Sequence, residues 1–358
     1  MDALLVPASR SGGPCVPHLV QLAAALGCPL VLLCSKGASA GSLASALGHG
    51  PADVLAVDLP SAYAPPGPTF ETTGLAEHLS PRRTDLTVKR NTFLLLSVMA
   101  GWERVLLVDD DMLLSDVPSL HRAAALLETY DVVSPDVAWF PDGSTTGHIS
   151  LALGEERQKF ITTGAMLVRP RATGSFFPHV YNEDWLYAVG DDVLLPVAVC
   201  GRATQLPYDP YRHAQRAGDE EFGELIALGV YWLLQRGGAM EVATRTEFWT
   251  RLRQLRSTRL AHLAAALSSA DLPDGPRMQA SLERARCTLE GITAADCAAF
   301  VGAWLRDKVR WRAYLGALPA ILDAGAALTE LGLSRIHRLG PHATGAVPAW
   351  RAATTGLP

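Results

Sequence analysis

The sequence has no excess of basic residues and no paired cysteine motif, and these absences exclude several classes of protein. Its 31 lysine and arginine residues are outnumbered by 36 acidic residues, and the net charge of −5 argues against a general nucleic-acid-binding surface. Its six cysteines form no C-x-x-C pair, so we expect buried or incidental thiols in a reducing compartment, not a zinc knuckle or a dithiol redox site. Lysine, isoleucine and asparagine are also scarce, which is typical of a GC-rich bacterial genome.

Long hydrophobic runs are missing as well. The longest apolar stretches, such as residues 314–328, are interrupted or too short to span a bilayer, so membrane insertion is not expected. The N-terminus lacks a basic segment and leads directly into a strand-like run, which is not the pattern of a secretory signal. We therefore expect a cytoplasmic protein.

The first half of the chain alternates strand-like and helix-like segments. We predict strands at residues 4–8, 29–34, 53–57, 105–108 and 131–134, and helices at 16–26, 39–47, 89–100 and 118–130. This alternation predicts an α/β protein with an open, mostly parallel sheet and helices on both faces. Ligands of such sheets bind beyond the carboxyl ends of the strands. Residues 59–86 are predicted to form a long connecting loop.

The C-terminal part of the chain has a different pattern. Helices are predicted over residues 222–234, 246–267, 276–289 and 294–317, and residues 219–221 are interpreted as the acidic first turn of the first of these. We divide the chain into an α/β domain at 1–240, a helical region at 241–337 and a flexible tail at 338–358.

Three adjacent aspartates, Asp109, Asp110 and Asp111, follow the predicted strand at 105–108. Adjacent carboxylates repel one another unless a cation or hydrogen-bond donors neutralise them. Their hard oxygens favour Mg²⁺ or Mn²⁺, held together with substrate phosphates. The alternative interpretation is an acidic turn with a helix cap.

Two basic residues, Lys89 and Arg90, begin the predicted helix at 89–100. Positive side chains at a helix N-terminus are unfavourable for the helix itself, whereas the same position binds phosphate readily. We therefore expect Lys89 and Arg90 to bind a phosphate group. A solvated surface turn is the alternative for Lys89.

These segments resemble the nucleotide-binding half of family 2-like glycosyltransferases with the GT-A fold. Residues 87–113 (TVKRNTFLLLSVMAGWERVLLVDDDML) are similar to that family's Arg-Asn helix start, closing glycine and strand ending in Asp-x-Asp. Residues 160–168 (FITTGAMLV) resemble its acceptor-side strand, and residues 181–186 (YNEDWL) resemble its Glu-Asp motif. The resemblance spans roughly residues 1–235 and does not cover the helical C-terminus, which remains an extension of a Rossmann-like GT-A domain.

The resemblance implies a metal-dependent glycosyltransferase. Such an enzyme moves a sugar from a nucleoside-diphosphate sugar to a hydroxyl of a soluble small-molecule acceptor, with inversion at the anomeric carbon. Asp184 would be the general base, and Glu183 is the alternative for that role. Asp111 and Asp109 would bind Mn²⁺ or Mg²⁺, with His213 as a further ligand.

The resemblance also implies a set of nucleotide-binding residues. They are Ser9, Arg10, Ser35, Asp58, Asp85, Lys89, Arg90, Asp109 and Asp110. The family's aspartate that contacts the base is missing from residues 33–37, which read LCSKG, so Asp58 or Asp85 is expected to replace it. The identity of the nucleobase stays open.

Two other classes of function stay open as alternatives. An Asp-x-Asp after a strand also resembles haloacid dehalogenase-like phosphatases, although Leu113 stands where their motif has Thr or Val. A degenerate transferase domain that acts as a binding or scaffold protein is the second alternative. The C-terminal helices are expected to pack on the catalytic domain, to shape the acceptor side or to form a homodimer.

Overall fold

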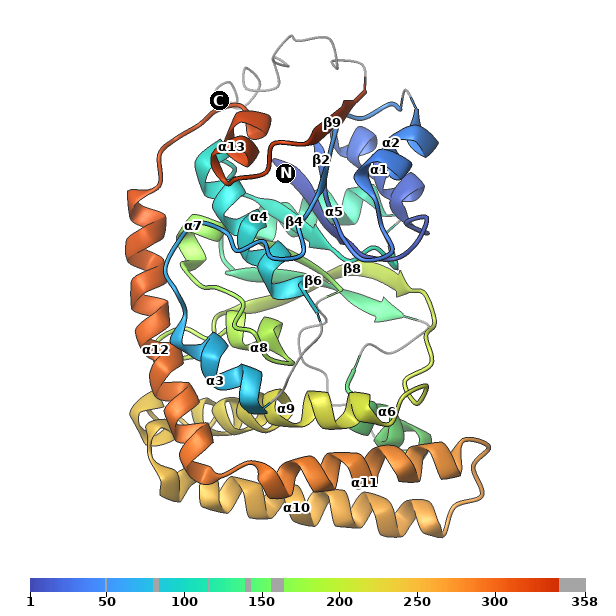
Figure 1. The fold of residues 1–358 in the computed structure, drawn as a ribbon, viewed down its shortest axis with the longest axis vertical. Coiled ribbons are helices and arrows are strands. Elements are labelled where there is room, and N and C mark those ends of the chain that lie inside the picture. The colour runs from blue at the N-terminus through green and yellow to red at the C-terminus, as the bar shows by residue number, and fades with distance from the viewer. Residues whose placement is uncertain (49, 80–83, 115, 139–142, 156–163, 341–358) are drawn as a thin grey trace.

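The computed structural model describes residues 1–48, 50–79, 84–114, 116–138, 143–155 and 164–340, and a mixed sheet lies at its centre (Figure 1). Within these ranges the sheet has nine strands in the order β5-β8-β6-β7-β4-β1-β2-β3-β9. Their bounds are β1 Ala3–Ala8, β2 Leu30–Cys34, β3 Val54–Asp58, β4 Val105–Val108, β5 Met112–Leu113, β6 Val132–Ala138, β7 Ala165–Val168, β8 Val197–Gln205 and β9 Ile336–Leu339.

Most of the strands run in one direction. β1 pairs in parallel with β2 and β4, β2 with β3, and β6 with β8. β7 is antiparallel to both β4 and β6, and the edge strands β5 and β9 are antiparallel to their neighbours. The prediction of an α/β protein with a mostly parallel sheet is confirmed.

The central strands are apolar on both faces because each face is covered by helices. Successive residues of β1 alternate between two hydrophobic cores, with Leu5 in one core and Leu4 and Val6 in the other. Helices α1 (Val16–Leu26), α2 (Ala40–Leu47) and α5 (Val117–Leu126) contribute to the core around Leu4. Helix α4 (Leu86–Ala100) packs in the core around Leu5. Both α1 and α4 end at a glycine with positive φ, Gly27 and Gly101.

The C-terminal helices belong to the same core as α4. They are α9 (Gln215–Leu234), the 3₁₀ turn η1 (Met240–Thr244), α10 (Thr246–Ser268), α11 (Gly275–Gly291), α12 (Ala294–Ala317) and α13 (Ala324–Glu330). Leu260, Phe300 and Trp304 of this region share one buried cluster with Leu5 and Leu107 of the sheet. In Figure 1, α10 and α11 lie side by side below α9, and α12 rises along one side of the molecule towards α13.

The chain returns to the sheet after these helices. Ile336–Leu339 form β9, which pairs with β3 through Val54 and Leu339, so the predicted tail does not begin at residue 338. This edge strand could not be seen in the sequence, because it is short and flanked by glycine-rich and proline-rich segments. Residues 341–358, the rest of the predicted tail, lie outside the described residues.

Helix α3 (Glu71–Leu79) occupies part of the predicted long loop at residues 59–86. The Asp307 side chain of α12 accepts hydrogen bonds from the backbone N–H groups of Glu71 (3.1 Å) and Thr72 (2.9 Å). These are N–H groups that a helix leaves without an intrahelical partner. The cap of α3 is therefore supplied from another part of the chain, which is why the local sequence did not predict it.

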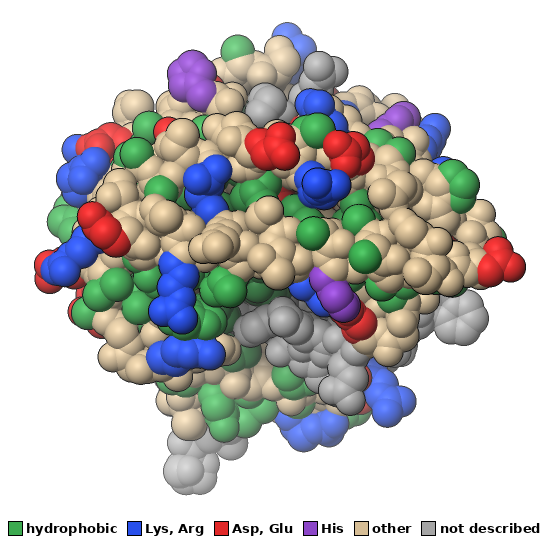
Figure 2. All heavy atoms as spheres, turned by 90° about the horizontal axis from the view of Figure 1, so that it is seen from below, with side chains coloured by type: hydrophobic (Ala, Val, Ile, Leu, Met, Phe, Trp, Pro, Cys, Tyr) green, Lys and Arg blue, Asp and Glu red, His purple; other side chains and the backbone are tan. Residues whose placement is uncertain are grey.

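Three shorter helices complete the fold. They are α6 (Thr145–Ala152), α7 (Pro170–Thr173) and α8 (Glu183–Tyr187). Ala165–Val168 form β7, the second half of the predicted strand at 160–168, whereas residues 156–163 lie outside the described residues. None of the described helices is both long enough and apolar enough to cross a lipid bilayer. On the face seen in Figure 2, acidic and basic side chains are interspersed.

A buried ionic network joins α9 to α10. Arg256 of α10 donates two hydrogen bonds of 2.7 Å to the Glu221 carboxylate and one of 3.2 Å to Thr146 Oγ1. Glu221 and Arg256 are both buried, and burial raises the pKa of Glu221 although Arg256 opposes the shift. Glu221 was predicted to lie in the acidic first turn of the helix at 222–234. That prediction is wrong because α9 begins six residues earlier and turns this side chain inward.

Replacing Arg256 by methionine is expected to lower the free energy of unfolding by about 3–5 kcal/mol, because Glu221 stays buried without its counter-charge. Urea unfolding of the two proteins measures the difference. Arg245→Met is the control, because Arg245 pairs with Glu241 at the surface, where the two side chains are 60% and 76% exposed. That control is expected to cost less than about 1 kcal/mol. Equal losses in the two variants would contradict a stabilising role for the buried pair.

Candidate functional site

The order of the strands has a switch point at the carboxyl ends of β1 and β4. The chain proceeds from β1 outward through β2 and β3, and then returns to place β4 on the other side of β1. Such a switch in strand order is where open α/β sheets bind their ligands. Ser9 and Arg10 follow β1 at this point, and Asp109–Asp111 follow β4. The predicted ligand-binding residues of these two strands thus lie at one edge of the sheet.

Backbone hydrogen bonds fix the three aspartates in place. Asp109 N donates to Gly164 O at 2.8 Å, next to β7, and Leu206 N donates to Asp111 O at 2.9 Å, next to β8. Met112 N closes a turn by donating to Asp109 O at 3.2 Å. The carboxylates are therefore held on a backbone that three strands constrain.

Asp110 anchors the loop that follows β1. Its Oδ2 accepts the backbone N–H groups of Ser9 (2.6 Å) and Arg10 (2.9 Å), and its Oδ1 pairs with the Arg10 guanidinium. The Asp110 side chain is only 1% exposed. Because protein groups engage both of its oxygens, Asp110 holds Ser9 and Arg10 beside β4.

Arg90 connects the aspartates to the Glu-Asp motif. Its Nη2 donates to both oxygens of Asp109, at 3.1 and 3.3 Å, and its Nη1 donates to Glu183 Oε1 at 3.0 Å. The Arg90 side chain is 3% exposed. Burial would lower the pKa of Arg90, but the charges of Asp109 and Glu183 outweigh it and raise that pKa. This guanidinium therefore stays charged between two carboxylates that lie far apart in the sequence.

The same burial changes the acidity of Asp109. Burial raises the pKa of Asp109 to about 6; the Arg90 charge opposes this rise, and the neighbouring charge of Asp111 adds to it. Asp109 thus ionises much less readily than an exposed aspartate.

Glu183 and Asp184 form the first turn of α8, and both are buried. The residue before them, Asn182, has a φ of 58° and donates from Nδ2 to Glu224 Oε2 of α9 at 3.0 Å. A side chain at Gly223 of α9 would collide with the backbone just before Asn182, so α9 approaches this turn closely. Asp184 Oδ1 accepts a hydrogen bond of 2.7 Å from the backbone of Trp185. Helix α9 therefore helps to set the position of the Glu-Asp pair.

Lys89 contacts the ends of two strands. Helix α4 begins at Leu86, so Lys89 and Arg90 are its fourth and fifth residues and not its first ones, and their role at a phosphate stays a prediction. Lys89 is buried, and its Nζ donates to Ala8 O at 2.7 Å and to Ser35 Oγ at 2.6 Å. Lys89 therefore ties the ends of β1 and β2 to α4, and it is not a surface residue.

Asp85, just before α4, lies near two lysines: Lys89 of α4 and Lys36, which follows β2. Its Oδ1 is 3.5 Å from Lys89 Nζ and 4.0 Å from Lys36 Nζ. Burial opposes ionisation of Asp85, but a hydrogen bond from Ser35 and the charges of Lys89 and Lys36 lower its pKa overall. Asp85 thus remains an anion beside these two lysines.

Asp58 and His213 are not drawn into the aspartate cluster. Asp58 Oδ1 accepts a hydrogen bond of 2.7 Å from the backbone of Ala40, at the start of α2. His213 has an exposed side chain on the loop before α9. Among the described residues no three His, Cys, Asp or Glu side chains form a group that could hold a metal ion. The predicted set of Asp109, Asp111 and His213 is therefore not assembled.

The sequence analysis missed Gln205, the last residue of β8. Its Nε2 donates to Asp111 Oδ2 at 3.4 Å, and its Oε1 is buried without a hydrogen-bond partner. A buried amide oxygen without a partner is costly unless something else binds it. The Asp111 carboxylate and this amide oxygen are ligands that suit Mg²⁺ or Mn²⁺ when substrate phosphates complete the shell. The residues at this site therefore fit a divalent cation, although no local sequence signal marked Gln205.

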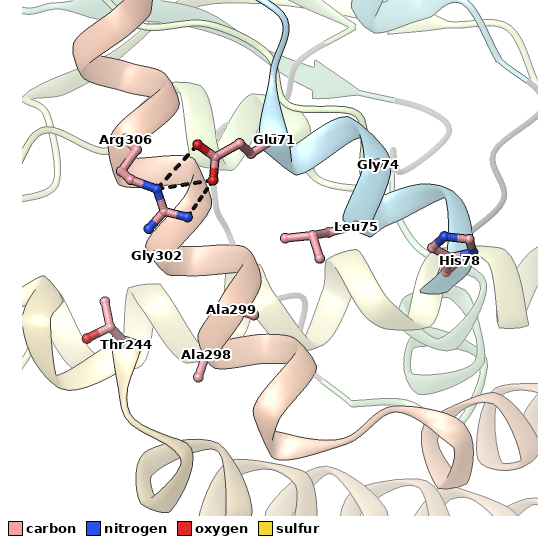
Figure 3. Close-up of a pocket in the computed structure, with 9 residues that line it drawn as sticks. All are labelled: Glu71, Gly74, Leu75, His78, Thr244, Ala298, Ala299, Gly302 and Arg306. Carbon is pink, nitrogen blue, oxygen red and sulfur yellow. Dashed lines mark hydrogen bonds and ion pairs between the residues drawn. The ribbon is translucent and has the colours of Figure 1, made fainter.

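A separate groove lies between α3 and α12 (Figure 3). It has a volume of about 810 Å³, and Leu75 of α3 faces the small residues Ala298 and Gly302 of α12. The ion pair between Arg306 and Glu71, with Nη2 2.5 Å from Oε2, borders the groove. Its lining contains none of the candidate residues, so the groove is distinct from the site at the sheet edge.

Comparisons with known proteins leave the function to be argued from this site. No family model matches the chain, and no curated protein matches it. One solved structure with a partial likeness is the mannosyltransferase PcManGT from Pyrobaculum calidifontis in complex with GDP-Man and Mn²⁺. Its TM-score is 0.43 at 15% sequence identity, with 86% of each chain covered. A likeness this distant carries no argument about what the chain binds.

Replacing Arg90 by glutamine is expected to destabilise the protein in a pH-dependent way. The folded pKa of Asp109 is about 6, above its ordinary value of 3.8, so ionising Asp109 costs stability as the pH rises through that interval. Without Arg90 the pKa of Asp109 in the folded protein rises further, so the stability lost on ionising Asp109 continues to grow at higher pH. The loss in free energy of unfolding is expected to reach about 2–4 kcal/mol near pH 8 and to shrink towards pH 5.

Urea unfolding at several pH values between about 5 and 8 measures this dependence. Arg104→Gln is the control, because Arg104 pairs with the exposed Glu128 at the opposite end of β4. Its effect is expected to be small at every pH in this interval. A loss in Arg90→Gln that does not change with pH would contradict the assigned bridge.

Proposed function

We propose that the chain is a glycosyltransferase of the GT-A type that uses a nucleoside-diphosphate sugar as its donor. The observation that carries this proposal is the Arg90 bridge between Asp109 and Glu183. The bridge joins the Asp-x-Asp segment, which resembles a donor-side motif, to the Glu-Asp segment, which resembles an acceptor-side motif. A donor and an acceptor bound at these two segments would meet at one site.

The donor is proposed to bind at the carboxyl ends of β1 and β4, where the strand order switches. Ser9, Arg10 and Ser35 line the ends of β1 and β2, where the nucleotide would lie. Asp111 and Gln205 would hold Mn²⁺ or Mg²⁺ together with the donor's phosphates, and Asp109, both of whose oxygens accept from Arg90, would contact the ribose or a water on the cation. When bound, the cation would neutralise the charge that develops on the departing nucleoside diphosphate.

Asp184 is proposed as the general base. Arg90 engages Glu183 Oε1 in a buried ion pair, so proton transfer is assigned to Asp184. Asp184 would take the proton from an acceptor hydroxyl while the oxygen of that hydroxyl attacks the anomeric carbon of the donor sugar. The bond from that carbon to the diphosphate oxygen breaks on the opposite face, which inverts the configuration. The acceptor is proposed to be a soluble small molecule.

Two substitutions separate donor binding from transfer. Asp111→Ala is expected to weaken Mn²⁺-dependent binding of UDP- or GDP-sugars at least about 10-fold, because the cation loses a charged ligand. Asp184→Asn is expected to keep donor binding within about 3-fold and to lower kcat by about 10²–10⁴. Isothermal titration measures binding, and mass spectrometry of an acceptor screen measures transfer.

Asp191→Asn is the matched control, because Asp191 is 73% exposed and pairs with Arg312 at the surface. It is expected to retain both binding and transfer. Failure of every nucleotide sugar to bind in the presence of Mn²⁺ would contradict the proposed function. Full transfer by Asp184→Asn would exclude that residue as the base. Release of phosphate from simple phosphate esters, without transfer, would favour the phosphatase alternative.

A further inference from the structure

The Arg10 guanidinium lies across two of the three aspartates. Its Nη1 pairs with Asp110 Oδ1, and its Nη2 donates to Asp111 Oδ2 at 2.7 Å. The Arg10 side chain is 46% exposed, whereas those of Asp110 and Asp111 are 1% and 4% exposed. Arg10 therefore covers the two buried carboxylates from the solvent side.

The two carboxylates have different neighbours besides the Arg10 guanidinium. Asp110 also accepts two backbone N–H groups, from Ser9 and Arg10, and it keeps these donors when the guanidinium moves. Asp111 faces the Arg10 guanidinium and, at 3.4 Å, the amide of Gln205. Gln205 Oε1 is buried beside Asp111 with no hydrogen-bond partner. The atoms that suit a divalent cation therefore gather at Asp111, where Arg10 supplies the positive charge.

A guanidinium and a divalent cation cannot share Asp111 Oδ2. A magnesium ion binds a carboxylate oxygen at about 2.0–2.1 Å, so it would lie only a few ångströms from the guanidinium nitrogen. At that separation the repulsion between the two positive charges is large. Arg10 has to leave Asp111 before a cation can bind there, and its half-exposed side chain can move without disturbing the core.

We infer that Arg10 takes the place of the divalent cation at Asp111 in the ligand-free protein and moves to the donor's diphosphate when cation and donor bind. This inference rests on the proposed function and adds a mode of regulation to the same site. A diphosphate offers the planar guanidinium a pair of acceptor oxygens close to the carboxylates that it leaves.

The exchange makes cation and diphosphate bind cooperatively. A cation alone displaces Arg10 into water, whereas a cation that arrives with a diphosphate gives Arg10 a new anionic partner. Coupling of this kind is reciprocal, and it is typically about 5- to 150-fold in affinity. Without the guanidinium, the cation has no competitor and most of this coupling disappears.

Binding of Mn²⁺ to the full chain, followed by electron paramagnetic resonance of the unbound ion, tests the inference. The titration is made with Mn²⁺ alone and again with UDP or GDP present. Arg10→Gln is expected to bind Mn²⁺ alone at least about 10-fold more tightly than the wild type, and its coupling to the nucleotide is expected to fall to a few-fold. Arg10→Lys carries a charge but cannot bridge two carboxylates. Its affinity for Mn²⁺ alone is expected to lie between those of the wild type and Arg10→Gln.

Arg104→Gln serves as the control, because it removes a positive charge at the other end of β4, and it is expected to behave as the wild type. Unchanged or weaker binding of Mn²⁺ alone by Arg10→Gln, in protein with the wild-type circular dichroism spectrum, would overturn the inference and leave the proposed function standing. Undiminished coupling in that variant would overturn it as well. Absence of Mn²⁺ binding in all variants, with and without either nucleotide, would instead contradict the metal-dependent transferase itself.

Discussion

The site depends on one buried guanidinium. Arg90 lies between Asp109, at the end of β4, and Glu183, at the start of α8, and it is almost entirely removed from solvent. Two buried carboxylates would repel each other and pay a large desolvation penalty without it. Because Arg90 belongs to the buried helix α4, whose side chains pack in the core of the sheet, it fixes both carboxylates relative to the strands.

The C-terminal helices complete the region that carries the site. Arg256 of α10 neutralises Glu221 of α9, and Asp307 of α12 caps α3. Helix α9 in turn contacts the Glu-Asp pair's neighbour: Glu224 of α9 accepts a hydrogen bond from Asn182, the residue just before Glu183. Buried polar groups of the two halves of the chain thus satisfy one another, so the helical region helps to hold the turn that carries Glu183 and Asp184.

The sequence predicted those elements whose signals are local. β1, β2 and β4 are short, continuous apolar runs, and α1 and α4 end at glycines that adopt the left-handed conformation. The aspartate cluster and the Glu-Asp pair were predicted in the same way, from short motifs. Elements with distant partners were missed, because nothing near them in the chain shows what stabilises them.

Lys89 and Gln205 illustrate this limit. A lysine beside an arginine at a helix start suggested a phosphate site, and nothing nearby showed that Ala8 and Ser35, more than fifty positions away, accept hydrogen bonds from this lysine. Gln205 lies next to Asp111 only because β8 joins β5 and β6 in the sheet. Similarly, the bridge formed by Arg90 could not be predicted, although each of its three residues belongs to a recognised motif.

A crystal structure of the full chain with Mn²⁺ and either GDP or UDP would test the central claim most directly. The account predicts the nucleotide diphosphate at the carboxyl ends of β1 and β4, with the cation on Asp111 and the Arg90 bridge to Glu183 intact. A nucleotide bound elsewhere, for example in the groove between α3 and α12, or a cation with no bond to Asp111, would contradict it.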